Sequence, residues 1–202
     1  MSPRSKQQNA QIKDDRRAQI LNAALAVFAR RGLAATKIAD IAAQAGLSHG
    51  LVYHYFPSKE DIFVELIRIA DTSSSSALLQ AEQMPLPPKE KLHAIAEMVL
   101  QSFQTQSDSA YMFYLMGQAM MSDSTPPAAK EILARYGIPY EVVTRIICQG
   151  QAQGTIAKGD PAQLAMTFWA AIQGFATYQL VSPGAMQPDV DVLMRMFQPK
   201  QE

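Results

Sequence analysis

Apolar residues along most of this chain recur every three or four positions, which is the spacing of one face of an α-helix. In the segment 14–31, these residues are Ile20, Leu21, Ala24, Leu25 and Phe28. No segment shows the sustained alternation of apolar and polar residues that a half-buried strand requires. The pattern therefore predicts an all-α protein.

Glycine, proline and capping residues divide this pattern into about nine helices. The predicted helices lie at 14–31, from Thr36 to a break at Gly46, from Ser48 to just before Pro57, and at 58–82, 88–106, 109–121, 126–152, 161–181 and 188–198. The clearest cap is Asp160, which is followed by Pro161 at the first helical position. The serine-rich tract TSSSS (72–76) either bends the fourth helix or forms a loop, and the sequence does not choose between them.

Composition narrows the class of protein. With 202 residues, 48% hydrophobic and 18% charged, the chain is expected to be globular and to bury a sizeable core. Its one cysteine, Cys148, excludes an internal disulfide framework and fits a reducing compartment. The uncharged segment 161–188 contains prolines and glutamines, which favours a helix buried in protein over a membrane span. With no apolar signal at the N-terminus, we expect a cytoplasmic protein.

Charge is distributed unevenly along the chain. Residues 1–60 carry nine Lys or Arg against four Asp or Glu, a net charge of +5, and the remainder carries −5. A basic N-terminal quarter on an acidic body is the asymmetry expected of a nucleic-acid-binding module joined to a regulatory domain. A solvated surface of five charges is the competing interpretation, so a second observation is needed.

Residues 36–56 supply that observation, because they have the spacing of a helix-turn-helix. Ala42 is the small residue required in the first helix, and Gly46 is the glycine at the tight turn. The residues expected where the two helices press together are Ile38, Ile41, Ala45, Leu47, Val52 and Tyr55.

The second helix of this motif would present a polar outer face to a DNA major groove. Ser48 and Tyr53 can donate hydrogen bonds to phosphates, and Gly50 allows the helix backbone to approach the bases. Packing of Tyr53 and His54 on the next helix is the competing interpretation. The candidate DNA contacts, which include residues at helix N-termini, are Thr36, Lys37, Ser48, His49, Gly50, Leu51, Tyr53, His54 and Lys59.

The segment TKIADIAAQAGLSHGLVYHYFPSKEDIF (36–63) resembles the DNA-binding segment of the tetracycline-repressor (TetR) family of bacterial transcription regulators. The resemblance covers roughly residues 14–66, and the segment 150–175 is more loosely similar to the C-terminal pattern of many members. It implies an all-helical homodimer of about nine helices that binds a palindromic operator and releases it when a small molecule enters the C-terminal domain. The resemblance further implies phosphate contacts from Thr36, Tyr53 and Lys59, and base-facing positions at Ser48, His49 and Gly50. Many members have Lys, Arg or Thr at the position of His49, so the operator sequence cannot be transferred from a relative.

These observations predict three segments: a flexible basic arm (1–13), a helix-turn-helix domain (14–60) and a ligand-binding and dimerisation domain (61–202). In the last of these, residues 98–121 are rich in methionine and aromatic residues, which suit either an adaptable pocket or an ordinary helical core. The candidate pocket residues are Met98, Phe103, Tyr111, Tyr114, Tyr140 and Trp169. No acid or arginine stands out among them, so a mainly apolar or aromatic effector is expected.

The uncharged helix 161–181 carries more apolar surface than one side can bury, which predicts pairing with a second copy. The candidate dimer residues are Phe168, Ala171, Ile172, Phe175, Tyr178, Val192 and Met196. An enzyme is not expected, because the three histidines lack metal-binding spacing and the chain lacks HExxH, GxSxG, phosphate-loop and dinucleotide motifs. No cofactor or metal is expected. The alternative to a ligand-released repressor is an architectural DNA-binding protein that responds to no ligand.

Overall fold

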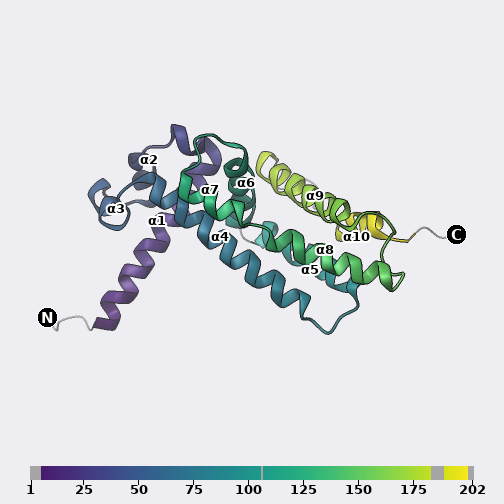
Figure 1. The fold of residues 1–202 in the computed structure, drawn as a ribbon. Helices are drawn as coiled ribbons and strands as arrows, with labels where there is room; N and C mark the ends of the chain where they lie inside the picture. Colours follow the sequence, from purple (N-terminus) through teal and green to yellow (C-terminus); the bar gives the residue numbers. More distant parts are fainter. Residues whose placement is uncertain (1–5, 106, 183–188, 200–202) are drawn as a thin grey trace.

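The computed structural model of the chain describes residues 6–105, 107–182 and 189–199. In these ranges the chain forms ten α-helices and one short 3-10 helix, with no strand (Figure 1). The elements are α1 (Lys6–Ala35), α2 (Ile38–Ala45), α3 (His49–Tyr55), α4 (Lys59–Glu82), α5 (Pro88–Thr105), α6 (Ser107–Met121), α7 (Pro127–Ala134), α8 (Ile138–Ala152), α9 (Pro161–Val181), α10 (Val190–Met194) and η1 (Arg195–Phe197). The predicted all-α fold is confirmed.

The helix predicted over 126–152 is two helices in the structure. Helix α7 ends at Ala134, and α8 begins at Ile138 with Gly137 as its N-cap residue. Pro139 lies in the first turn of α8, where its missing N–H leaves no hydrogen bond unmade. In one continuous helix Pro139 would remove a backbone hydrogen bond and clash with the preceding turn. The prediction of a single helix was therefore wrong.

Helix α1 is longer than the sequence predicted, and it is kinked. It begins at Lys6, so residues 6–13 are helical where the sequence predicted a flexible arm, while residues 1–5 lie outside the described residues. The Lys, Gln and Ala residues of this segment are good helix formers, and the N-terminal half of α1 projects from the body (Figure 1). Near the other end, Gly32 has φ 74° and ψ 162°, a backbone conformation that favours glycine. The predicted helix end thus corresponds to this kink.

Two hydrophobic cores stabilise the fold. The first is built by α1, α2, α3 and the start of α4, and it also receives Leu115, Met116 and Ala119 from α6 and Ala129 from α7. The second is built by the end of α4 together with α5, α8, α9 and α10. The N-terminal helices therefore do not close their own core, because side chains of α6 and α7 complete it.

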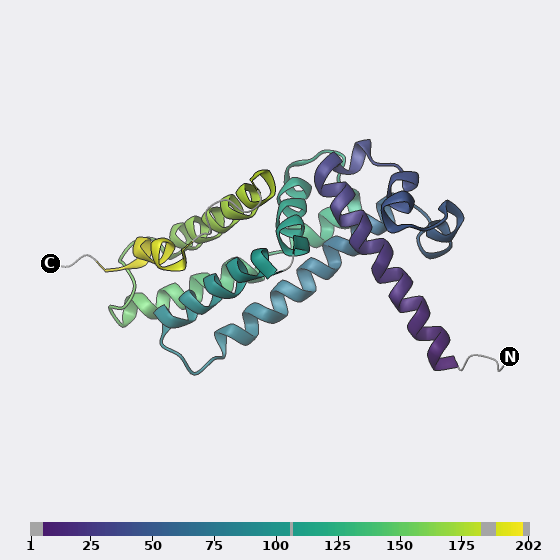
Figure 2. The same cartoon turned by 180° about the vertical axis from the view of Figure 1, so that it is seen from behind.

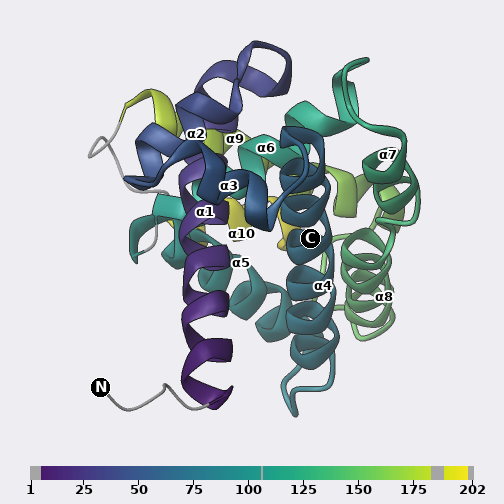
Figure 3. The same ribbon diagram turned by 90° about the vertical axis from the view of Figure 1, so that its left-hand side faces the viewer.

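Helix α6 connects the two halves of the molecule. It contacts both α1 and α9, and it stands between them in the view from behind (Figure 2). Helix α1 in turn packs against α2, α4 and α6, as the view toward the N-terminal helices shows (Figure 3). Helix α6 is therefore in direct contact with both halves of the molecule.

The serine tract 72–76 lies inside α4, which is helical from Lys59 to Glu82. This resolves the choice between helix and loop in favour of helix. The Ser74 hydroxyl donates to the Asp71 carbonyl at 3.2 Å, the local bond that serine makes in a helix. Among the described residues, no helix, α9 included, has both the length and the apolar character needed to cross a bilayer.

Candidate DNA-binding surface and ligand cavity

Helices α2 and α3 meet at the tight turn that the sequence predicted. Gly46 is in the left-handed region at φ 65°, and the Ser48 hydroxyl caps α3 by accepting from the Leu51 N–H at 3.3 Å. The predicted inner residues Ile38, Ile41, Ala45 and Val52 are buried, while Leu47 and Tyr55 are half-buried against the same core. The helix-turn-helix interpretation is confirmed.

The outer face of α3 is exposed and carries the polar residues that the sequence placed there. Ser48, His49, Gly50, Tyr53 and His54 are all exposed, and the rings of His49 and Tyr53 meet edge to face at 4.9 Å. Tyr53 is 47% exposed, so the interpretation in which it packs on the next helix is wrong. Leu51 is half-buried at the edge of this face.

Gly50 has an open environment. A Cβ atom added at this position would meet nothing within 4 Å among the described residues. The fold itself therefore does not require glycine here, although glycine weakens a helix.

Thr36 is not placed to contact DNA through its side chain, contrary to the sequence prediction. It is 1% exposed, and its hydroxyl donates to the Gly32 carbonyl at 2.7 Å, next to the kink in α1. The N-cap of α2 is Lys37, which is exposed and whose backbone N–H donates to Asp40 Oδ2 at 2.9 Å. That hydrogen bond, and then the Arg31 guanidinium, hold the pKa of the Asp40 carboxyl below its ordinary value of 3.8. Thr36 positions the helix-turn-helix instead of contacting phosphate.

Lys59 is also a positioning residue in the structure. Its ammonium donates to the carbonyls of Leu33 and Thr36 at 2.8 Å and to that of Ala34 at 3.1 Å. An ammonium has three N–H donors, so these bonds use all of them. Lys59 thus satisfies the carbonyl groups at the end of α1, and the predicted phosphate contact from this side chain is not supported.

Part of the basic excess of the N-terminal quarter is likewise used inside the molecule. Arg17 pairs with Glu65 at 2.8 Å and lies over the Phe56 ring at 5.0 Å. Arg31 pairs with Asp40 at 2.9 Å. The sequence could not separate these internal ion pairs from cations that are available to a partner.

A cavity of about 560 Å³ lies in the body between α4, α5, α6, the segment that joins α7 to α8, the start of α8, and α9. Its volume is within the range of small-molecule sites. The lining residues are Ala70, Ser73, Ser74, Ala77, Leu78, Met98, Val99, Ser102, Ser109, Met112, Phe113, Met116, Gly117, Met120, Met121, Tyr136, Pro139, Tyr140, Met166, Trp169, Ala170 and Gln173. No charged side chain is among them.

Three of the six predicted pocket residues, Met98, Tyr140 and Trp169, line this cavity, and the other three do not. Phe103 is buried against Phe113, with ring centroids 5.1 Å apart. The Tyr111 hydroxyl accepts from the Arg30 guanidinium at 3.0 Å, so this ring faces α1. Tyr114 is half-buried outside the lining. The methionine-rich composition of 98–121 pointed to the right segment, but helix rotation decided which side chains face the cavity.

Some polar groups of the cavity are hydrogen-bonded within the protein, and others are not. The Trp169 indole N–H donates to the Pro139 carbonyl at 3.2 Å, and the Tyr136 and Ser74 hydroxyls are 3.3 Å apart. Burial raises the pKa of the Tyr136 phenol, so this hydroxyl stays protonated at neutral pH. The Gln173 side-chain amide makes no hydrogen bond within the described part of the chain, and it lies over Gly117.

The predicted dimer residues divide between core and surface. Phe168 and Ile172 are fully buried inside their own chain, which excludes them from a contact with a second copy. Ala171 and Phe175 are half-buried against that core, and Tyr178, Val192 and Met196 are exposed. The exposed face of α9, of which only Tyr178 was in the predicted set, carries uncharged residues throughout: Met166, Ala170, Gly174, Tyr178 and Val181. Met166 and Ala170 also line the cavity.

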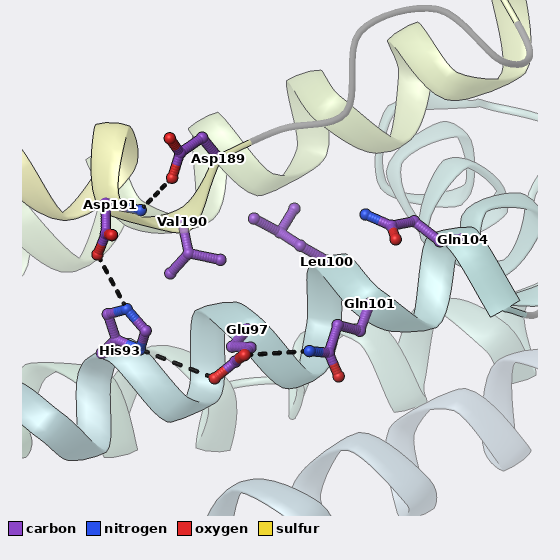
Figure 4. Close-up of a pocket in the computed structure, with 8 residues that line it drawn as sticks. All are labelled: His93, Glu97, Leu100, Gln101, Gln104, Asp189, Val190 and Asp191. Atoms are coloured by element: carbon purple, nitrogen blue, oxygen red, sulfur yellow. Dashed lines mark hydrogen bonds and ion pairs between the residues drawn. The ribbon is translucent and has the colours of Figure 1, made fainter.

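A second, polar groove of about 340 Å³ lies between α5 and α10 (Figure 4). Its side chains pair with one another: His93 Nε2 is 3.2 Å from Asp191 Oδ1, and Gln101 donates to Glu97 at 3.1 Å. Asp189 caps α10 by accepting from the Asp191 N–H at 2.8 Å. Of these contacts, the one between His93 and Asp191 joins α5 to α10. No group of three or more potential metal ligands occurs among the described residues.

The geometry defines a helix-turn-helix protein with a cavity-bearing helical body. Residues 20–66 match the family described as "Bacterial regulatory proteins, tetR family". The predicted resemblance to the TetR family is therefore confirmed over the helix-turn-helix segment.

Curated relatives agree over the same segment. The chain is 49% identical over 55 residues to the HTH-type transcriptional repressor KstR2 of Mycobacterium tuberculosis, and 36% identical over 85 residues to the HTH-type transcriptional regulator HbdR of Aromatoleum. These alignments cover 27% and 42% of this chain but only 28% and 37% of the relatives. The chain therefore matches about a third of the length of either relative.

Solved structures show that the fold extends over nearly the whole chain. The crystal structure of AibR in complex with isovaleryl coenzyme A and operator DNA superposes with a TM-score of 0.75 at 20% identity, covering 90% of this chain and 97% of AibR. A tetR-family regulatory protein from Rhodococcus RHA1 superposes with a TM-score of 0.74 at 23% identity, covering 92% and 98%. At these identities the likeness concerns the fold alone.

Proposed function

We propose that this protein is a homodimeric transcriptional repressor that binds a palindromic operator through α3 and is released when a small, mainly apolar or aromatic molecule occupies the cavity. The observation that carries the proposal is the outer face of α3, where exposed polar side chains surround a glycine that the fold does not require. KstR2, a relative over this segment, is a transcriptional repressor, which supports the same role here.

The DNA contacts in this proposal come from residues that the structure leaves exposed. Tyr53, Ser48 and Lys37 are placed to meet phosphates, which position the helix without reading sequence. His49 and Gly50, with Leu51 at the edge, face the bases, because they occupy the N-terminal half of α3. His54 flanks them at the other end of the helix.

The proposed release acts through α6. Met112 and Met116 line the cavity, and Met116 also belongs to the core of the N-terminal helices. One turn away, Tyr111 accepts the hydrogen bond from Arg30 of α1, and the guanidinium lies 5.7 Å from the Tyr111 ring centroid. A molecule that shifts α6 therefore moves the helix on which the helix-turn-helix is mounted. The bound molecule can weaken DNA binding only by as much as it prefers the shifted position of α6 over the DNA-binding position.

The proposed dimer forms through the uncharged outward face of α9. Met166, Tyr178 and Val181 are 58%, 51% and 76% exposed, a continuous apolar stripe of the kind that marks an interface. The small residues Ala170 and Gly174 lie between them and allow close approach of a second helix. A two-fold pair would place the two copies of α3 on successive turns of DNA.

The test begins with selection of bound sequences from a random DNA pool at physiological salt. An enriched palindrome with half-sites about ten base pairs apart is expected. If no sequence is enriched and DNA affinity decreases smoothly as the salt concentration rises, the protein is an architectural DNA-binding protein and not a specific repressor.

The selected site then tests the role of Tyr53. Tyr53→Phe removes one phosphate hydrogen bond and is expected to weaken binding about fivefold, equally on all variants of the site. Tyr114→Phe is the matched control, because Tyr114 lies on α6, away from α3. A loss that depends on the base sequence would instead assign Tyr53 to base recognition.

A further inference from the structure

The wall of the cavity has a chemistry that selects among small molecules. It contains six methionines, aliphatic residues, aromatic rings, hydroxyls and one amide, but no acid, lysine, arginine or histidine. A charged group that enters such a site loses its hydration and finds no opposite charge. An uncharged molecule meets no such cost, and methionine side chains adapt to its shape.

The wall carries one side-chain amide, that of Gln173. The Gln173 amide forms no hydrogen bond with any described residue, although it can donate two and accept two. The amide lies against Gly117 on α6, where an added Cβ would be only 3.3 Å from the Gln173 Nε2. Glycine at 117 thus leaves room for an amide that lines the cavity and has no hydrogen-bond partner among the described residues.

Several of the other polar groups are already engaged within the protein. The Ser74 hydroxyl donates to the Asp71 carbonyl and lies 3.3 Å from the Tyr136 hydroxyl, while the Trp169 N–H is bound to the Pro139 carbonyl. The faces of Tyr136, Tyr140 and Trp169 would attract a cation, but no carboxylate lines the cavity beside them. The wall as a whole therefore favours a neutral occupant.

We propose that the cavity takes an uncharged, predominantly hydrocarbon molecule that carries one hydroxyl or carbonyl group, and that Gln173 binds this group. This inference rests on the proposed function, whose ligand class it specifies. It excludes free carboxylic acids in their ionised form and quaternary ammonium compounds as occupants of the interior. Gln173 is then the residue that distinguishes a polar-ended molecule from a plain hydrocarbon.

Trp169 provides a direct readout, because it is the only tryptophan of the chain and it lines the cavity. Its fluorescence is titrated in the full-length protein at pH 7 with four probes of equal chain length: 1-octanol, octane, octanoate and octyltrimethylammonium. We expect 1-octanol to bind at least about thirtyfold more tightly than either ion, because the ions would be buried without a partner. Equal or tighter binding of an ion, or no saturable response to 1-octanol, overturns the inference.

Variants separate the role of Gln173 from general stability. Gln173→Leu is expected to reduce the preference for 1-octanol over octane about fivefold, the value of one hydrogen bond between neutral groups, while octane affinity is retained. Gln149→Leu, on the exposed surface of α8, is the matched control and is expected to leave the preference unchanged. A retained preference in Gln173→Leu would remove Gln173 from the proposal.

DNA release is measured separately, so the two proposals can fail independently. If 1-octanol changes Trp169 fluorescence but leaves the selected DNA fragment bound, the ligand class stands and the ligand-responsive function does not. If octanoate or octyltrimethylammonium releases the DNA while 1-octanol does not, the function stands and the ligand class is wrong.

Discussion

The two hydrophobic cores of this protein contain the same kinds of residues but differ in packing: the N-terminal core is filled, whereas the core of the body borders the cavity. In the N-terminal core, Phe28 is fully buried and meets Phe63 edge to face at 5.5 Å. In the body, Phe113 meets Phe103 in the same geometry at 5.1 Å, but its other side faces the cavity. A closely packed core holds the helix-turn-helix in one shape, whereas an incompletely filled one can take up another molecule.

The largest expected difference between the two cores comes from truncating these two phenylalanines. Phe28→Ala should lower the free energy of unfolding by about 4 kcal/mol, because it creates a cavity in a filled core. Phe113→Ala should cost roughly half as much, because one side of the ring already lacks packing partners. Urea denaturation of both variants measures the difference, and equal losses would show that the cavity is filled or collapsed in solution.

The second prediction concerns the dependence of the body on a second copy. Gly174→Arg adds a charged side chain where a Cβ meets nothing within 4 Å, so folding of the single chain should be unaffected. Burying that charge in the proposed α9 contact should instead produce monomers and weaken operator binding by about a hundredfold or more. Analytical ultracentrifugation checks this, with Gly174→Ala as a control that should remain dimeric. A dimeric Gly174→Arg variant would place the interface elsewhere.

A smaller effect is expected from removing the ammonium that fixes the helix-turn-helix on α1. Lys59→Met leaves the Leu33, Ala34 and Thr36 carbonyls without their donor and should cost about 2 kcal/mol of stability. The salt dependence of DNA binding should keep its slope, because no phosphate contact is lost. Binding isotherms at several salt concentrations test this. If the slope of log affinity against log salt concentration decreases by about one, Lys59 does contact a phosphate.

The smallest expected effect is on the pH dependence of stability, and it involves one ion pair in each region. Asp40, held by the Lys37 N–H and by Arg31, and Glu82, held by Arg145 at 2.7 and 2.9 Å, both have a lowered pKa. A carboxyl with a lowered pKa stabilises the fold above its ordinary pKa and loses that contribution as the pH falls. The unfolding temperature should therefore decrease below about pH 4.5, the ordinary value for Glu82, and further below 3.8 for Asp40.

The variants Asp40→Asn and Glu82→Gln should each flatten part of this decrease. At pH 7, Glu82→Gln should lower the unfolding temperature by about 1–2 °C, because a pair with a solvent-exposed arginine contributes only about 0.5 kcal/mol. Scanning calorimetry between pH 3 and pH 7 checks both variants. An unchanged pH profile in either one would mean that its ion pair is not maintained in solution.

Local signals were sufficient for the helix-turn-helix. Gly46 sits at the turn, Ser48 caps α3, and the apolar positions of α2 and α3 face inward, as the sequence predicted. Each of these features depends on residues within a few positions of one another. The same holds for α9, whose cap at Asp160 and whose end at Val181 were both predictable.

Contacts between distant segments decided the rest. Lys59 and Thr36 have the residue types of DNA contacts, but the carbonyls at the end of α1 engage both side chains. Phe168 and Tyr178 lie on one uncharged helix, and only the packing of α9 against its neighbours buries the first and exposes the second. The sequence by itself determined most of the helices, the turn and the polar outer face of α3, because hydrogen bonds and side-chain periodicity within a segment specify them. The tertiary structure alone decided which cations are used internally and which side chains line the cavity, because both depend on how helices far apart in the sequence rotate and pack together.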